Sequence, residues 1–316
     1  MVNLLKRSGW GMAMLLAAAP FTFAQGAPPV AEPGTINYVE GIVQINGKLI
    51  TKKQVGSIEV AQGGVLSTAN GRAEMLLTPG VYMRLDSNSA LTMVSPELTH
   101  TTIQLTRGEL LAEVDQIEKE NRLEIAVNGV TTRLLKTGVY EFHTDPPSVA
   151  VFTGKAEATE GRHVFDAYRG EQILLTPQVR HAVRKFHRKA PDDLYAWSKL
   201  RSEYAAEAGE NMAQEAALGT GPYGWYGPGW FWDPYFDMWG FFPMDAYMWG
   251  PFGFPFYSPL FYGGGYGYYG YGRYGYRGGG VVTGSGSRGT ASGAFLGGMG
   301  GFRGGMGGFH GGGGRR

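Results

Sequence analysis

A run of basic side chains stands between residues 180 and 189, where the sequence reads RHAVRKFHRK. Lysine and arginine groups this close together can bind anionic lipid headgroups, lipopolysaccharide or acidic polysaccharide, and added salt should weaken such binding. The alternative is a solvated connector that leads from the last strand to a helix. If the run binds a ligand, the interaction residues are Arg180, Arg184, Lys185, Arg188 and Lys189.

Aromatic side chains next to prolines are the second group that could bind a ligand. They are concentrated in GPGWFWDPYFD at residues 227–237 and in PFGFPFYSP at residues 251–259. Rings stack on sugars and on one another, and nearby arginines allow cation–π contacts, so these segments favour binding to envelope polysaccharide or a protein partner, or self-association. Plain disorder is the alternative. The candidate residues are Trp225, Trp230, Trp232 and Tyr235.

Motifs for catalysis and cofactor binding give no support for an enzyme. The glycine pattern of dinucleotide-binding loops occurs at residues 265–270 and 284–289, but neither copy lies in a βαβ unit. The sequence contains no GxSxG nucleophile elbow and no HExxH zinc motif. Glu109 and Glu113 are interpreted as solvated strand residues, and the histidines share no metal-ligand spacing. We therefore predict no catalytic residue, no cofactor and no metal.

Composition narrows the classes of protein further. The absence of cysteine from all 316 residues excludes disulfides, thiolate catalysis and cysteine-bound metal clusters. The formal net charge is only +1, so no general field attracts nucleic acid, and we predict no nucleic-acid partner.

The first residues have the pattern of an export signal. Lys6 and Arg7 precede a short apolar stretch from Gly9 to Pro20, and small residues follow, with cleavage expected after Ala24. The apolar stretch is shorter than the roughly 20 residues that a membrane span requires. We predict a signal peptide at residues 1–24, a periplasmic or cell-surface location, and no transmembrane segment in the mature chain.

Short alternations of apolar and polar residues dominate residues 34–176 and predict many β-strands. Glycines precede several of these strands, and at Gly80 and Gly138 we expect tight turns with positive φ. The spacing of the glycines is irregular. The sequence therefore predicts an all-β domain at residues 27–189, built as a short irregular β-solenoid or a β-sandwich-like fold.

One α-helix is predicted at residues 190–218. Pro191 and the two acids after it suit a first turn, whereas the second half, which Gly209 interrupts, should fray. An apolar stripe should dock the helix on the β domain or on a partner, and it consists of Leu194, Trp197, Leu200, Tyr204 and Ala208.

The last segment, residues 219–316, contains no lysine and no glutamate and is rich in glycine, tyrosine, tryptophan and proline. Glycine makes backbone ordering costly, and few branched aliphatic residues are present to fill a core. We predict a low-complexity disordered tail, and we expect its removal to leave the stability of the β domain nearly unchanged.

An ordered set of strand segments resembles the FecR domain. The first and longest is GVLSTANGRAEMLLTPGVYMRLDSNSALTM at residues 64–93, and TIQLTRGELLAEV at 102–114 follows. Pieces at 130–142 and 149–158 agree in the same order, so the resemblance covers roughly residues 34–176. Regulatory members of this family resemble relays that pass the state of an outer-membrane transporter to a cytoplasmic sigma factor, through one membrane span and a cytoplasmic N-terminal domain. Too few residues precede the apolar stretch here for such a domain.

These observations favour a non-catalytic, exported binding or structural module of the bacterial cell envelope, with the tail mediating interaction or assembly. The alternative is a sensory component of a FecR-type signalling system, which reports on a ligand or transporter through a separate partner.

Overall fold

The computed structural model describes residues 30–176, 183–186, 192–220 and 227–263. The predicted signal peptide lies outside the described residues, as does the part of the tail after residue 263. The same holds for four candidate interaction residues, Arg180, Arg188, Lys189 and Trp225.

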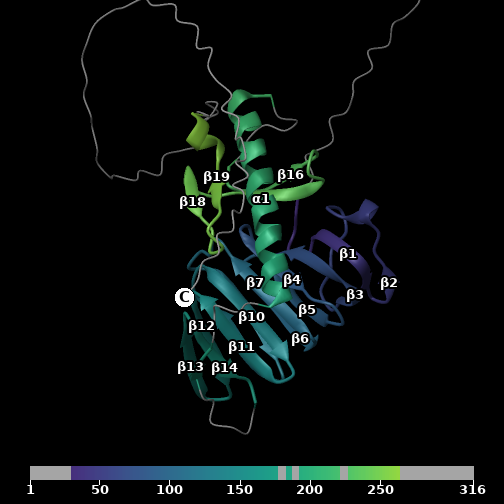
Figure 1. Cartoon of the computed structure of the whole chain (residues 1–316), viewed down its shortest axis with the longest axis vertical. Coiled ribbons are helices and arrows are strands. Elements are labelled where there is room, and N and C mark those ends of the chain that lie inside the picture. Colours follow the sequence, from purple (N-terminus) through teal and green to yellow (C-terminus); the bar gives the residue numbers. More distant parts are fainter. Residues whose placement is uncertain (1–29, 177–182, 187–191, 221–226, 264–316) are drawn as a thin grey trace, which may run out of the picture. The chain divides into compact units, whose positions relative to one another are not determined.

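Most of the described strands belong to one sheet of 15 strands (Figure 1). Its order is β13-β12-β9-β8-β6-β5-β3-β4-β7-β10-β11-β14-β15, with β1 attached to β3 and β2 to β1. Only β6 and β8 pair in parallel among these described strands. The strands are β1 (Ile36–Ile45), β2 (Lys48–Leu49), β3 (Val65–Leu76), β4 (Val81–Leu85), β5 (Ala90–Glu97), β6 (His100–Arg107), β7 (Glu109–Val114), β8 (Arg122–Val127), β9 (Val130–Leu134), β10 (Gly138–Thr144), β11 (Pro147–Thr153), β12 (Lys155–Glu160), β13 (His163–Tyr168), β14 (Glu171–Leu174) and β15 (Val183–Lys185), with a 3₁₀ turn η1 (Lys52–Gln54) after β2.

The sheet curls into a nearly closed barrel, so that β13 contacts β14 and β15 near the other end of the strand order. Its inner face encloses the main apolar core. Strand β7 shows the alternation that produces this core: Leu110, Ala112 and Val114 point inward, whereas Leu111 and Glu113 lie on the outer face. The prediction of an all-β domain followed by one α-helix is confirmed.

Helix α1 (Asp193–Leu218) packs on the outer face of the sheet (Figure 1). It begins at Asp192, whose side chain accepts a hydrogen bond from the backbone N–H of Tyr195, and it ends at Gly219 with φ 68°. The helix continues through Gly209, so the predicted fraying of its second half is wrong. A Cβ atom at Gly209 would lie 3.0 Å from the carbonyl oxygen of Phe241, and glycine therefore allows another backbone to approach the helix closely.

The packing face of α1 agrees with the predicted apolar stripe at Leu194, Trp197 and Ala208 but not at its other two residues. Leu200 and Tyr204 are 46% and 41% exposed. Small and polar residues replace them at the interface, including Ser198, Ser202 and Ala205, all fully buried. Small side chains allow the helix to lie close to the sheet. The prediction considered mainly large apolar residues and therefore did not identify these positions of the face.

Residues 229–262 form ordered structure, so the predicted disorder is wrong for this part of the tail. The prediction rested on the shortage of branched aliphatic residues, but aromatic rings fill the core instead, because each ring buries a large apolar area. Trp239, Phe241, Phe242 and Phe256 are at most 1% exposed. The elements are β16 (Gly229–Asp233), β17 (Met238–Phe242), β18 (Tyr247–Trp249), β19 (Pro255–Tyr257) and the 3₁₀ helix η2 (Pro259–Tyr262).

The two glycines expected in tight turns differ. Gly80 has φ 81°, so the expectation is confirmed there. Gly138 is absent from the positive-φ residues of the described chain, so the expectation is wrong there. A Cβ atom at Gly138 would lie 2.2 Å from the carbonyl oxygen of Thr153. Glycine at this position therefore permits close approach of two strands rather than a turn.

Candidate functional site

A group of charged side chains, the buried ionic cluster, lies between the outer face of the sheet and α1. Arg84 on β4 donates to Glu74 on β3 through Nε at 2.8 Å and to Glu113 on β7 through Nη1 at 2.5 Å. From α1, Arg201 Nη2 donates to Glu74 Oε1 at 2.9 Å and Ser202 Oγ donates to Glu113 Oε1 at 2.6 Å. The cluster therefore joins three strands to the helix.

Burial and charge act in opposite directions on these carboxyl groups. Burial would raise the pKa of Glu74, but Arg201 and Arg84 lower the pKa below its usual value. For Glu113, burial outweighs Arg84 and raises the pKa. Glu113 was predicted to be solvated, and the structure corrects this, because the helix covers the outer face on which its side chain lies.

Asp115 extends the cluster at the end of β7. Its side chain is fully buried, and neither of its oxygens receives a hydrogen bond in the described chain. Burial and the adjacent Glu113 raise the pKa of Asp115 well above its usual value. Because burial favours the neutral form of both acids, the negative charge of the three carboxyl groups comes closer to the charge of the two guanidinium groups.

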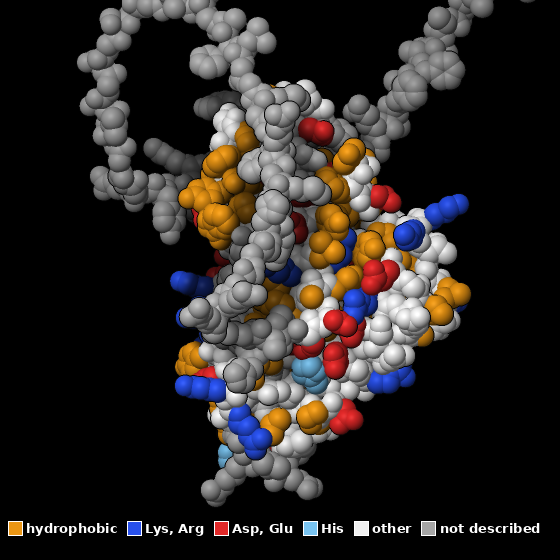
Figure 2. All heavy atoms as spheres, viewed as in Figure 1, with side chains coloured by type: hydrophobic (Ala, Val, Ile, Leu, Met, Phe, Trp, Pro, Cys, Tyr) orange, Lys and Arg blue, Asp and Glu red, His pale blue; other side chains and the backbone are white. Residues whose placement is uncertain are grey.

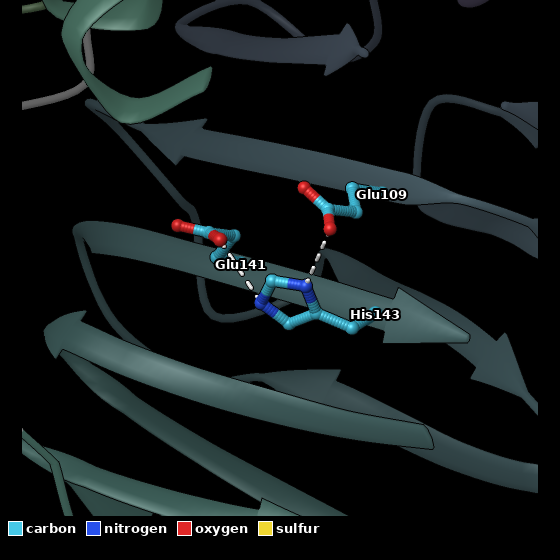
Figure 3. Close-up of side chains that lie close together, drawn as sticks. All are labelled: Glu109, Glu141 and His143. Atoms are coloured by element: carbon cyan, nitrogen blue, oxygen red, sulfur yellow. Dashed lines mark ion pairs between the residues drawn. The ribbon is translucent and has the colours of Figure 1, made fainter. Parts of the chain in front are cut away.

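A second group, the Glu–His cluster, lies on the same outer face and consists of Glu109 on β7 with Glu141 and His143 on β10. The imidazole of His143 stands between the two carboxylates (Figure 3): its Nε2 is 2.9 Å from Glu141 Oε1 and its Nδ1 is 3.4 Å from Glu109 Oε1. The register of β7 and β10 places His143 directly opposite Glu109. Glu141 and His143 lie two residues apart on one strand and so share a face.

The Glu–His cluster changes the proton affinity of its members. Burial raises the pKa of Glu141 to about 7 despite the hydrogen bond with His143. Burial lowers the pKa of His143, but Glu141 and Glu109 outweigh this and raise it to about 9. The position of the ring between two carboxyl groups therefore favours its protonated form. This arrangement can hold a cation, whether a proton or a metal ion.

An exposed aromatic face forms on the hairpin of β18 and β19 and on η2. Tyr247, Trp249 and Phe261 are 52%, 63% and 49% exposed, and Tyr257 packs between them, with ring centroids 6.5 Å from Tyr247 and 4.7 Å from Phe261. Figure 2 shows hydrophobic side chains gathered over these elements. The opposite side of the hairpin packs inward through the fully buried Phe256. This face, comprising Tyr247, Trp249, Tyr257 and Phe261, has the composition of a binding surface.

The candidate residues of the aromatic segments have different surroundings. The Trp230 indole N–H donates to the Leu77 carbonyl at 3.3 Å, and the Trp232 ring packs edge-on against Trp239. Both rings thus hold the hairpin of β16 and β17 in place. Tyr235 is 84% exposed at the turn of that hairpin. Of the basic run, Arg184 and Lys185 lie exposed on β15, and a ligand for them stays a prediction.

Residues 64–157 match the family model described as FecR protein. This chain contains a FecR domain. The matched range contains every residue of the two charged clusters that precedes α1, namely Glu74, Arg84, Glu109, Glu113, Asp115, Glu141 and His143. Helix α1 and the hairpins that follow it lie outside the match.

Two solved structures resemble this chain weakly. Both are crystal structures of a candidate anti-sigma factor from Parabacteroides distasonis ATCC 8503, each 16% identical in sequence, with TM-scores of 0.34 and 0.33. The similarity covers 43% of this chain and 64% and 62% of those structures, so the chain spans less than two thirds of either. Similarity at this level carries no argument about function. No curated protein matches the chain.

In the part of the chain that the structure describes, no helix has the length and apolarity that a bilayer span requires. Sequence reasoning missed both charged clusters. The Glu-x-His spacing of Glu141 and His143 was a usable signal, but Glu109 joins them only through strand register.

Proposed function

We propose that this protein is a sensory component of FecR-type envelope signalling, which detects the state of an envelope ligand or transporter and reports it through a separate protein partner. The observation that carries this proposal is the match of residues 64–157 to the FecR family. The role requires binding and a change in contacts, and we assign no catalytic step to the protein.

Export through a cleavable signal peptide is part of the proposal. The charged residues Lys6 and Arg7, the short apolar stretch after them and the small residues near Ala24 support it. A protein in the periplasm or at the cell surface can meet an envelope ligand directly. It then needs a membrane-spanning partner to carry the signal inward.

The surface that we assign to the protein partner is the aromatic face. Tryptophan and tyrosine are enriched at protein interfaces, where a rigid ring buries a large area at a low cost in side-chain entropy. The hairpin beneath this face packs on α1, and α1 contacts the FecR domain through the buried ionic cluster. A partner bound there would contact a part of the chain that is linked to the domain by charged groups.

Site-specific photo-crosslinking tests this proposal in cells of the source organism. A benzophenone amino acid is placed at Tyr247 or Trp249, and at Tyr168 on β13 as a control that is also 50% exposed. We expect Tyr247 and Trp249, but not Tyr168, to capture the same membrane-spanning protein. Deleting the gene of that protein and substituting Trp249→Ala should then change the transcription of the same genes.

Other outcomes would replace the signalling role. Crosslinks between two copies of the chain, or to polysaccharide, with no change in transcription, would favour the structural module with a role in assembly. Equal capture from Tyr168 would show that the aromatic face has no specific partner.

A further inference from the structure

The Glu–His cluster brings together the side-chain types that bind transition metals. One ligand atom from each of Glu109, Glu141 and His143 lies within 4.8 Å of the others. We propose that this cluster binds one divalent transition-metal ion of the Zn²⁺ class between strands β7 and β10. The site is separate from the aromatic face and goes beyond the signalling role proposed above.

Glu141 supplies an independent indication of a cation site. This residue is only 2% exposed, and its Oε2 atom has no hydrogen-bond partner, while Oε1 faces His143. The carboxyl group of Asp192, which caps α1, interacts with Glu141 and adds a second negative charge beside it. A buried acid in contact with a second acid is stabilised by a proton or by a bound cation.

The distances suit a metal ion after a small rearrangement. Bonds of about 2.0–2.2 Å to nitrogen and oxygen place neighbouring ligand atoms of a tetrahedral site about 3.3–3.6 Å apart. The contacts of His143 with Glu141 and Glu109 measure 2.9 and 3.4 Å. Each carboxylate now faces a different ring nitrogen, so one of them has to turn, and the ring nitrogen that binds the ion releases its proton to solvent. The Glu109 side chain is 41% exposed and therefore has room to move.

The donor set determines the class of metal. An imidazole nitrogen with two carboxylates suits Zn²⁺ and related ions, whereas Mg²⁺ and Ca²⁺ prefer oxygen ligands alone. Three protein ligands leave at least one coordination position for water. Since His143 is 20% exposed and Glu109 is more so, solvent reaches the cluster and an ion can enter and leave.

Isothermal titration of the full mature chain with ZnCl₂ tests the site. We expect one ion per chain for the wild type, and affinity at least about tenfold weaker in His143→Asn and Glu141→Gln. Glu109→Gln changes a partly exposed ligand and should also weaken binding without disturbing the core. The matched control is His100→Asn, which removes a surface histidine 3.4 Å from Glu124. Among the described residues this pair belongs to no group of three metal-binding side chains, so the variant should bind as the wild type does.

Far-UV circular dichroism of each variant separates loss of metal from loss of fold. Weaker binding in folded Glu109→Gln and His143→Asn, with His100→Asn unchanged, supports the site. No stoichiometric binding by the wild type would overturn the proposal. Zn²⁺ binding by Glu109→Gln and His143→Asn as tight as that of the wild type would overturn it too, because the ion would then be held elsewhere in the chain.

Discussion

Arg84 shows how one side chain can link a sheet to a helix. Its guanidinium group lies between Glu74 and Glu113, and all three side chains are fully buried. Moving charges out of water is costly unless each has a partner, and here Arg201 and Ser202 of α1 contact the same two carboxylates. The position of the helix therefore depends on charge balance as well as on apolar contact.

Replacing Arg84 should be severely destabilising. In Arg84→Met, Glu74 loses one of its two arginine partners, and Glu113 keeps only the hydroxyl of Ser202. We expect a loss of about 3–5 kcal/mol in the free energy of unfolding, measured by urea denaturation. The control Arg72→Met breaks a partly exposed pair with Asp86 and should cost about 1 kcal/mol or less. Equal losses in the two variants would contradict this account.

Asp115 should make stability depend on pH. In the unfolded chain the carboxyl group of Asp115 loses its proton near about pH 4. In the folded protein, burial and Glu113 hold the pKa of Asp115 well above that value. The raised pKa means that the stabilisation is complete below about pH 4 and is lost as pH rises toward the folded pKa, by about 1.4 kcal/mol per pH unit.

Asp115→Asn removes this titration while keeping the shape of the side chain. We expect the free energy of unfolding of the wild type to fall more steeply than that of Asp115→Asn between pH 4.5 and 7, in urea titrations at each pH. Parallel pH profiles would show that Asp115 is already ionised in the folded protein.

At the scale of elements, α1 and β17 pack with their backbones close together. A Cβ atom at Gly209 would lie 3.0 Å from Phe241 O, and one at Gly240 would lie 3.0 Å from the nitrogen of Gly209. Two glycines facing each other permit this approach, and the Phe241 ring then reaches the core beneath the helix. The hairpin is thus part of the packing of the helix.

Gly209→Val should separate these two elements. Its side chain has to displace the Phe241 backbone, and we expect a loss of about 1–3 kcal/mol in thermal or urea unfolding. Asn211→Val, at an exposed position of the same helix, is the control and should change stability little, because asparagine and valine have similar helix propensities. If Gly209→Val is as stable as the wild type, the helix and the hairpin can move apart without loss of stability, which would contradict this account.

At the scale of the whole molecule, the FecR domain and the segments after it share a core. Leu76 and Tyr82 of the sheet pack in one cluster with Trp239 and Phe241 of the hairpin and with alanines of α1. Asn37 of β1 reinforces this contact, since its side-chain oxygen accepts from the backbone N–H of Trp239 at 2.7 Å. The domain and its extension are therefore expected to unfold together.

Two truncations distinguish the ordered extension from the rest of the tail. A chain that ends at Gly263 keeps every contact described above and should melt close to the full chain. A chain that ends at Thr220 loses five buried aromatic side chains, and even a loss of about 5 kcal/mol would lower the melting temperature by about 10–20 °C. Calorimetry measures both. If the shorter chain melts as the longer one does, the β domain is independent of the extension, as its composition alone predicts.

The sequence by itself determined the period-two strands, the helix near residues 190–218, and the FecR resemblance, because these depend on local patterns and on their order along the chain. Local pattern also located Gly80 in a turn. It could not reveal that Glu113 is buried, since its exposure depends on a helix more than 80 residues later in the chain.

Only the tertiary structure determined which residues form the two charged clusters and that the aromatic segment is ordered. His143 meets Glu109 through strand register, and Arg201 meets Glu74 across 127 residues, so no spacing in the sequence encodes either contact. The rings of Trp239 and Phe241 order their glycine-rich surroundings because the sheet and α1 offer apolar surface to cover. Composition gives the number of apolar groups that could be buried. Which of them are buried depends on the surfaces that come into contact when the chain folds.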